Sequence, residues 1–197
     1  YHLGLFDEAT DEGRLARALN PSPNVELDRL EVAAQLFGGH FGRAAEQAAA
    51  LLPRTDAPAI RHYLGLARYY AGDANTAREV LASATRGGRP DVRAQSSLAS
   101  IEAALGMQRE ARERIRSIVR GAYMDHHVAY SLGAAYAQLG NLEESLTWLQ
   151  RAIDSGFPCY PWFERDTLLD PIRRKPGFVQ LLGRLRDAHE HARRRTQ

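Results

Sequence analysis

One stretch of the chain, from His126 to Pro158, reads HHVAYSLGAAYAQLGNLEESLTWLQRAIDSGFP. Apolar side chains recur at helical spacing in both halves of this stretch. Between the halves, Gly140 can adopt the left-handed backbone conformation that ends a helix. Asn141, followed three residues later by Glu144, then matches the cap at the start of a second helix. The stretch therefore predicts two helices joined by a tight turn.

The same pattern occurs twice upstream at a fixed distance. Gly72, Gly106 and Gly140 are each separated by 34 residues, and the residues around them repeat in step. The clearest columns are the bulky Leu64, Leu98 and Leu132, followed by the small Gly65, Ala99 and Gly133. Such a period is typical of a repeat array in which each unit buries its apolar face on the next. Small residues let the two helices of a unit approach closely.

These columns resemble the tetratricopeptide repeat family, over roughly residues 58–158. The resemblance implies an all-α fold, a right-handed superhelical solenoid of antiparallel helix hairpins with a C-terminal capping helix. The chain departs from the family at Arg68 and Glu102, where an aromatic residue is usual, and at Ile118, where alanine is expected. We therefore expect altered packing in the third complete hairpin.

We predict a single domain over residues 1–197, because a repeat array forms one continuous core. Its predicted parts are a truncated repeat at 1–23, complete repeats at 24–57, 58–91, 92–125 and 126–158, and a C-terminal cap at 159–197. Gly39 and Gly4 continue the phase of the turns, and Asn24 is placed to cap a helix that starts near Val25. If the repeat is extended to the start of the sequence, residues 1–3 are expected to form the last turn of a helix whose beginning is absent. The apolar edge of that first hairpin then lacks a cover.

The periodic pattern stops after Pro158, and prolines divide the rest of the chain. Pro171 and Pro176 are placed where helices can begin, and the final helix should cover the fourth complete hairpin. The run from residue 156 to residue 178 also resembles a tail that follows repeats in bacterial serine/threonine protein kinases and winged-helix regulators. We therefore expect the C-terminal part of a larger bacterial signalling or regulatory protein.

Composition excludes several other classes of protein. The formal net charge is only +2, so the chain is not a strongly basic domain. A single cysteine, Cys159, excludes an internal disulfide. No apolar run approaches the roughly 18 residues of a membrane-spanning helix, so we expect a cytoplasmic protein without a membrane span.

No motif for nucleophilic catalysis or phosphate binding is present, so we predict a non-catalytic segment without a cofactor. His126 and His127 are adjacent, and His189 and His191 are two apart. Such neighbours diverge around a helix, whereas zinc-binding pairs usually lie at i and i+4, so we predict no metal site. For Cys159, a packed small residue is favoured over a reactive thiol.

The concave surface, which this family lines with the first helix of each hairpin, is the predicted binding site. Tyrosine and arginine are favoured anchors at protein interfaces because they offer large contact areas. An alternative for Tyr69 and Tyr130 is that each only packs between hairpins. The candidate residues for binding a peptide or partner are Arg29, His62, Tyr69, Tyr70, Arg93, Ser96, His127, Tyr130 and Gln138.

The function predicted from these features is a protein-protein interaction scaffold that binds a peptide or a partner helix in the groove. Self-association through the uncovered N-terminal edge is a further possibility. One alternative is a region that regulates a parent enzyme, such as a serine/threonine protein kinase, or positions its substrates. Another is RNA binding, since pentatricopeptide repeats are similar hairpins, but the near-neutral charge and the 34-residue period argue against it.

Overall fold

The computed structural model describes residues 1–55, 58–84, 91–121 and 123–196, and every regular element within these ranges is a helix. The predicted boundary between residues 57 and 58 lies partly outside the described residues. The elements, with η marking 3-10 helices, are α1 (Phe6–Leu19), α2 (Val25–Gly38), α3 (Phe41–Leu51), η1 (Leu52–Arg54), α4 (Pro58–Tyr70), α5 (Ala74–Ala84), α6 (Val92–Ala104), α7 (Gln108–Val119), α8 (His126–Gln138), α9 (Leu142–Asp154), α10 (Tyr160–Arg165), η2 (Thr167–Ile172) and α11 (Pro176–Thr196).

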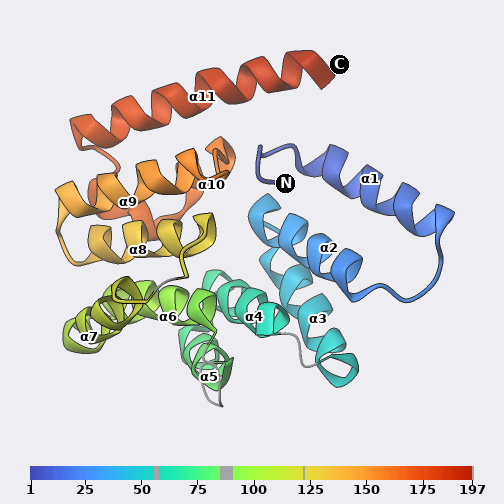
Figure 1. Ribbon diagram of the computed structural model, residues 1–197, viewed down its shortest axis with the longest axis horizontal. Coiled ribbons are helices and arrows are strands. Elements are labelled where there is room, and N and C mark those ends of the chain that lie inside the picture. Colours follow the sequence, from blue (N-terminus) through green and yellow to red (C-terminus); the bar gives the residue numbers. More distant parts are fainter. Residues whose placement is uncertain (56–57, 85–90, 122, 197) are drawn as a thin grey trace.

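Helices that are neighbours in the chain pack as pairs. The pairs are α2 with α3, α4 with α5, α6 with α7, and α8 with α9. The first helices of these pairs, α2, α4, α6 and α8, also contact one another in chain order. Figure 1 shows the pairs following an arc, with α11 beyond α9 at one end and α1 beside α2 at the other. The all-helical prediction is confirmed, and none of the described helices is both long and apolar enough to cross a membrane.

The glycines that set the sequence period lie at the predicted turns. Gly72, Gly106 and Gly140 have φ values of 92°, 79° and 76°. Upstream, Gly39 and Gly4 have φ values of 91° and 76°. Only glycine adopts this left-handed region without steric cost, so the repeat of glycine in the sequence follows from the repeat of the turn.

Two predicted helix starts are also confirmed. The Asn24 side chain accepts hydrogen bonds from the backbone N–H groups of Glu26 and Leu27 at 3.0 and 3.1 Å, and α2 begins at Val25. The Asn141 side chain accepts from the backbone N–H of Glu144 at 3.3 Å. Each cap satisfies N–H groups that have no partner within the helix.

The two helices of a pair approach closely where the repeat has a small residue, namely Gly65, Ala99 or Gly133. A Cβ placed on Gly133 would lie 2.7 Å from Cδ2 of Leu149 and 3.1 Å from the Leu149 backbone nitrogen. Leu149 is completely buried, so its side chain has no free space into which to move. Gly133 therefore sets the distance between α8 and α9.

Gly133→Ala should destabilise the protein by about 1–2 kcal/mol, because the cost of overpacking exceeds the gain in helix propensity. Gly183→Ala is the matched control, since Gly183 is also helical but a Cβ there would meet nothing within 4 Å. That control should gain up to about 1 kcal/mol. Urea denaturation measures both changes, and equal effects at the two positions would contradict the packing argument.

The third complete hairpin contains two residues, Glu102 and Ile118, that are unlike their counterparts in the tetratricopeptide pattern. Glu102 is buried, and Arg114 of the paired helix donates to it from Nε at 2.9 Å and from Nη2 at 2.8 Å. Ile118 is buried as well. A two-bond ion pair therefore occupies the place of the usual aromatic contact.

Residues 1–3 are not part of a helix that the structure describes, but they form a turn in which the Gly4 N–H donates to the Tyr1 carbonyl at 2.8 Å. Gly39, Gly72, Gly106 and Gly140 make the same bond to the third residue before them, so this turn has the hydrogen bond expected at the end of a first helix. The Tyr1 ring stacks on Phe37 with centroids 5.5 Å apart. A single helical turn is unstable alone, and burial of this aromatic ring stabilises it. The edge expected to be uncovered also contacts the C-terminal part of the chain, since His189 Nδ1 lies 2.8 Å from the Leu3 carbonyl.

The C-terminal predictions hold in part. Helix α11 begins at Pro176 and packs on α9 and α10 through a stripe that includes the buried Phe178, Leu181 and Leu185. Pro171 does not begin a helix, because it lies inside η2. That helix starts earlier because the Asp166 side chain caps it by accepting from the Leu168 N–H at 2.8 Å.

Candidate functional site

The inner face of the first helices is filled by the chain itself. Residues 160–172, which comprise α10 and η2, are called the inner segment below. Its η2 part packs on α8 and α6, and its α10 part contacts α2. Figure 1 shows α10 close to the N-terminus, near the open side of the arc. The groove expected to be free for a partner is therefore occupied by the inner segment.

A buried carboxylate fastens the inner segment to two of the first helices. Asp166 is only 1% exposed. The Tyr70 hydroxyl donates to its Oδ1 at 2.8 Å and the Tyr130 hydroxyl to its Oδ2 at 2.5 Å. Burial raises the pKa of Asp166, and the hydrogen bonds from Tyr130, Leu168 and Tyr70 oppose this rise. Burial also raises the pKa of both tyrosines well above 10, so each stays protonated as a donor.

An aromatic ring anchors the inner segment next to this carboxylate. Trp162 is 1% exposed, and its ring lies edge-on to Phe37 and Tyr70 at centroid distances of 5.0 and 4.9 Å. In the η2 part of the inner segment, the Leu168 carbonyl accepts a hydrogen bond from Nε2 of the Gln138 side chain at 2.7 Å. Three of the predicted groove residues, Tyr70, Tyr130 and Gln138, therefore bind the chain's own segment.

An open hollow remains beside the inner segment. Its volume is about 460 Å³, within the usual range for ligand sites, and its lining is mostly apolar. Tyr69 and Tyr70 contribute to it from the end of α4, and Trp162 contributes from α10. The full lining is Phe41, Tyr69, Tyr70, Gly72, Ala74, Trp162, Arg165, Asp166 and Thr167. Tyr69 and Tyr70 are thus the two predicted residues that border open space large enough for a ligand side chain.

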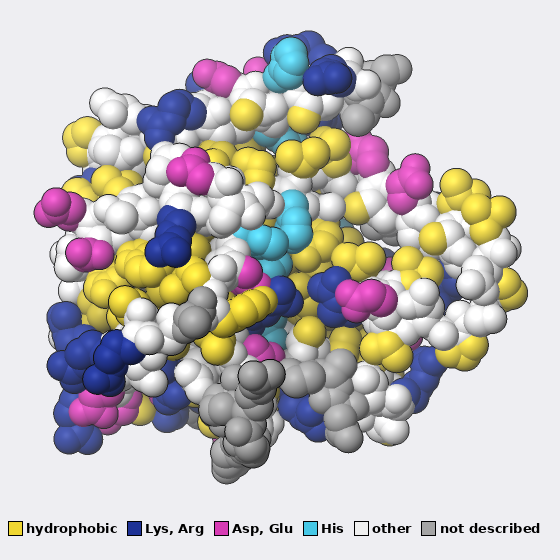
Figure 2. All heavy atoms as spheres, viewed as in Figure 1, with side chains coloured by type: hydrophobic (Ala, Val, Ile, Leu, Met, Phe, Trp, Pro, Cys, Tyr) yellow, Lys and Arg dark blue, Asp and Glu magenta, His cyan; other side chains and the backbone are white. Residues whose placement is uncertain are grey.

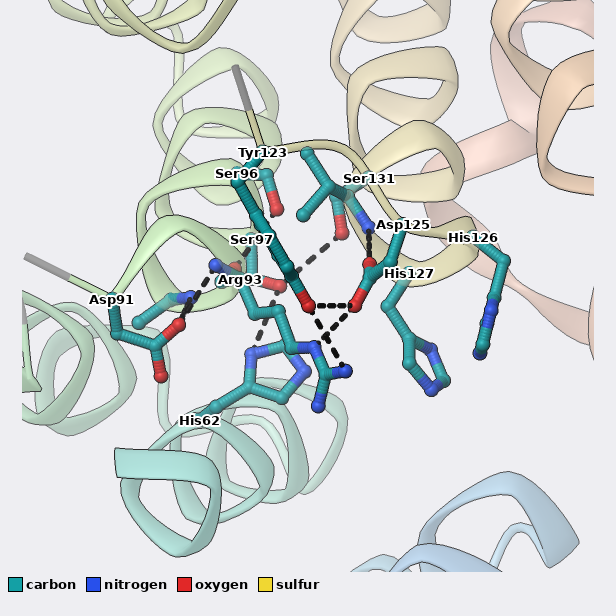
Figure 3. A network of polar contacts seen from close by, with 12 residues as sticks. His62, Asp91, Arg93, Ser96, Ser97, Tyr123, Asp125, His126, His127 and Ser131 are labelled. Carbon is teal, nitrogen blue, oxygen red and sulfur yellow. Dashed lines mark hydrogen bonds and ion pairs between the residues drawn. The ribbon is translucent and has the colours of Figure 1, made fainter. Parts of the chain in front are cut away.

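Arg93 is held in a network of polar contacts between α6 and α8 (Figure 3). Its Nε donates to Oδ2 of Asp125 at 2.5 Å, and the Tyr123 hydroxyl donates to the same oxygen at 2.9 Å. Although burial works in the opposite direction, the Val128 N–H and Arg93 hold the pKa of Asp125 below its usual value. Ser96 is buried and bonds to the Arg93 carbonyl at 2.9 Å. Arg93 and Ser96 therefore serve the packing of two hairpins.

Arg29 is likewise engaged within the protein. Its Nε donates to Glu26 at 2.8 Å, and its Nη1 donates to the Tyr63 hydroxyl at 3.3 Å. His62 is 1% exposed, with Nδ1 lying 3.4 Å from the Ser97 hydroxyl. A small cavity of about 20 Å³ beside His62 has room for roughly one water molecule. Arg29 and His62 are thus internal residues rather than open groove surface.

Three histidines meet where the N-terminal segment reaches the start of α8. Each of His2, His126 and His127 offers a ring nitrogen, and these nitrogens all lie within 4.8 Å of one another. The shortest separation, between Nε2 of His126 and Nε2 of His2, is 3.3 Å. Figure 3 shows the His126 and His127 rings pointing to the same side of α8, and Figure 2 shows histidine side chains gathered near the centre of this face.

Burial shifts the pKa of all three imidazoles in the same direction. Burial lowers the pKa of His2 to about 4 and holds the pKa of His127 well below its usual value. Burial also lowers the pKa of His126. The prediction that no metal site exists considered only histidines that are near one another in sequence, and it did not anticipate His2. The cluster brings together three ring nitrogens that sequence spacing could not reveal.

Cys159 is completely buried, and burial raises the pKa of its thiol to about 12. The thiolate is the reactive form of cysteine, so this residue is held in its unreactive form. The interpretation as a packed small residue is confirmed.

Comparison with known proteins gives no further guide to the site. No protein-family model matches the chain, and no curated protein matches it. The geometry of the described residues therefore carries the functional argument.

Proposed function

We propose that this chain is a non-catalytic protein-interaction scaffold of the tetratricopeptide type, with hairpins arranged as a right-handed solenoid. The 34-residue period and the serial contacts of α2, α4, α6 and α8 support this arrangement. The likeness of residues 156–178 to tails in bacterial signalling proteins supports a place in a larger regulatory protein. Since the inner segment fills the groove, the partner binds beside it.

The observation that carries this proposal is the aromatic hollow of about 460 Å³ next to the inner segment. The partly exposed Phe41, Tyr69 and Tyr70 line a space that can hold a leucine-sized or phenylalanine-sized side chain. Full burial of such a side chain contributes about 1.5–3 kcal/mol. The walls belong to packed helices, so little ordering cost opposes binding. The partner is therefore a peptide or helix with one large apolar anchor residue.

A substitution that fills the hollow should weaken this binding. Peptides selected on the wild-type protein from a display library should bind Ala74→Trp at least about tenfold more weakly, because the new ring occupies the anchor position. Thr147→Trp is the matched control, since it adds the same ring on the exposed outer face of α9. Titration calorimetry measures the affinities, and circular dichroism checks that both variants are folded. Equal affinity for wild type and Ala74→Trp would place the binding site elsewhere.

Trp162 also gives a direct optical readout of the hollow. The chain has two tryptophans, so Trp148→Phe leaves Trp162 as the single indole reporter. A peptide anchored in the hollow should change the emission of Trp162 with the same dissociation constant that calorimetry gives. A selected peptide that binds without altering this emission would contradict the proposed location.

A further inference from the structure

We propose that His2, His126 and His127 form a binding site for Zn²⁺. The site joins the N-terminal segment to the first turn of α8, residues that are more than a hundred positions apart in the chain. It is separate from the aromatic hollow, because no histidine lines that hollow.

The spacing of the nitrogens fits a tetrahedral ion. With zinc–nitrogen bonds of about 2.0–2.1 Å, two nitrogen ligands on one tetrahedral zinc lie about 3.3–3.4 Å apart. The two Nε2 atoms of His2 and His126 are 3.3 Å apart. The third nitrogen, from His127, lies within 4.8 Å of both, so a modest ring rotation completes a three-histidine face.

The chemistry of the donors selects the class of ion. Three imidazole nitrogens suit Zn²⁺ and related transition ions, whereas Ca²⁺ and Mg²⁺ require oxygen ligands. No carboxylate belongs to the group of candidate ligands found among the described residues. Sites with three protein ligands leave the fourth zinc position for water or another small ligand. His2 and His126 are both partly exposed, so an ion can enter from solvent.

Neighbouring groups hold the rings in orientations that suit ligation. Nδ1 of His126 faces Gly156, since it lies 4.0 Å from the position that a Cβ would take there, and Nε2 of the same ring faces His2. His127 is 5% exposed, and its ring stacks on Phe37 with centroids 5.7 Å apart. His126 therefore presents Nε2 to His2 before an ion binds, and the packed His127 ring lies beside them.

Titration of the metal-free chain with Co²⁺ and Zn²⁺ tests this proposal. Co²⁺ should give the intense visible absorption of tetrahedral coordination, and Zn²⁺ should displace it at one equivalent. Since the ion binds the folded state, saturating Zn²⁺ should also raise the Tm. His2→Ala and His126→Ala should each weaken Zn²⁺ binding at least about tenfold and remove the rise in Tm.

The control is the double variant His40→Ala/His191→Ala, which removes two histidines outside the cluster and should bind Zn²⁺ as wild type does. Tm values measured in EDTA separate loss of a ligand from loss of folding, and His2→Ala should remain folded. The proposal is overturned if Zn²⁺ does not bind, or if it binds wild type and His2→Ala equally. Binding that is lost only in the His40/His191 variant would equally overturn it.

Discussion

Trp162→Ala should lower the free energy of unfolding by about 3–5 kcal/mol, the range for truncation of a buried large aromatic residue. The indole is 1% exposed and lies among Phe37, Phe41 and Tyr70. Its removal leaves a cavity under the inner segment that the helices on either side cannot close. Urea denaturation followed by circular dichroism measures the loss.

Trp162→Phe is the matched variant, and it should lose much less stability than the alanine variant. Among the described residues, the Trp162 Nε1 has no hydrogen-bond partner, so a phenyl ring sacrifices contact area but no polar contact. If Trp162→Ala costs less than about 1 kcal/mol, the ring does not lie in a packed interior and the placement of α10 is wrong.

Asp166→Ala should be the second large effect, with a loss of about 3 kcal/mol or more. The substitution leaves three donors without their acceptor: the hydroxyls of Tyr70 and Tyr130 and the backbone N–H of Leu168. Each buried donor without a partner costs about 1–3 kcal/mol, and part of that cost is recovered because a buried carboxylate is also removed. Chemical denaturation again measures the change.

Asp170→Ala is the control for this prediction. Asp170 is exposed and pairs with Arg173 at 2.8 Å, so its loss should cost about 0–1 kcal/mol. Asp166→Asn should fall between the two alanine variants, because the amide oxygen still accepts one hydrogen bond without a buried charge. Similar losses for Asp166→Ala and Asp170→Ala would show that the Asp166 carboxylate does not bridge the helices.

The helices and their turns could be predicted because their signals are local and periodic. Gly72, Gly106 and Gly140 mark turns that need a left-handed residue, and Asn24 and Asn141 cap helices through neighbours two or three positions away. These signals depend on a few adjacent residues, so they can be recognised without knowledge of the surrounding structure.

The occupation of the groove could not be predicted in this way. Tyr70 and Tyr130 have the character of binding anchors, and they do bind, but their partner is Asp166 of the same chain. Nothing near Asp166 in the sequence marks it as buried, because its burial depends on contacts with residues 36 and 96 positions away. The inner segment lies between prolines and has no periodic apolar pattern, so its sequence does not indicate which helix it packs on.

The histidine cluster shows the same limit. Helical spacing predicts that His126 and His127 diverge around α8, but their ring centroids lie 4.4 Å apart in the first turn, and His2 approaches them from another part of the chain. Spacing arguments examine pairs within one helix, so a site assembled across the fold escapes them.

The inner segment packs against α8 through the contact between Tyr130 and Asp166. A double-mutant cycle between Tyr130→Phe and Asp166→Ala measures that contact. The two side chains share a hydrogen bond of 2.5 Å between α8 and the inner segment. The four unfolding free energies should give a coupling energy of about 1–3 kcal/mol, as expected for a buried hydrogen bond to a carboxylate. Additive losses, with a coupling below about 0.3 kcal/mol, would contradict the placement of the inner segment in the groove.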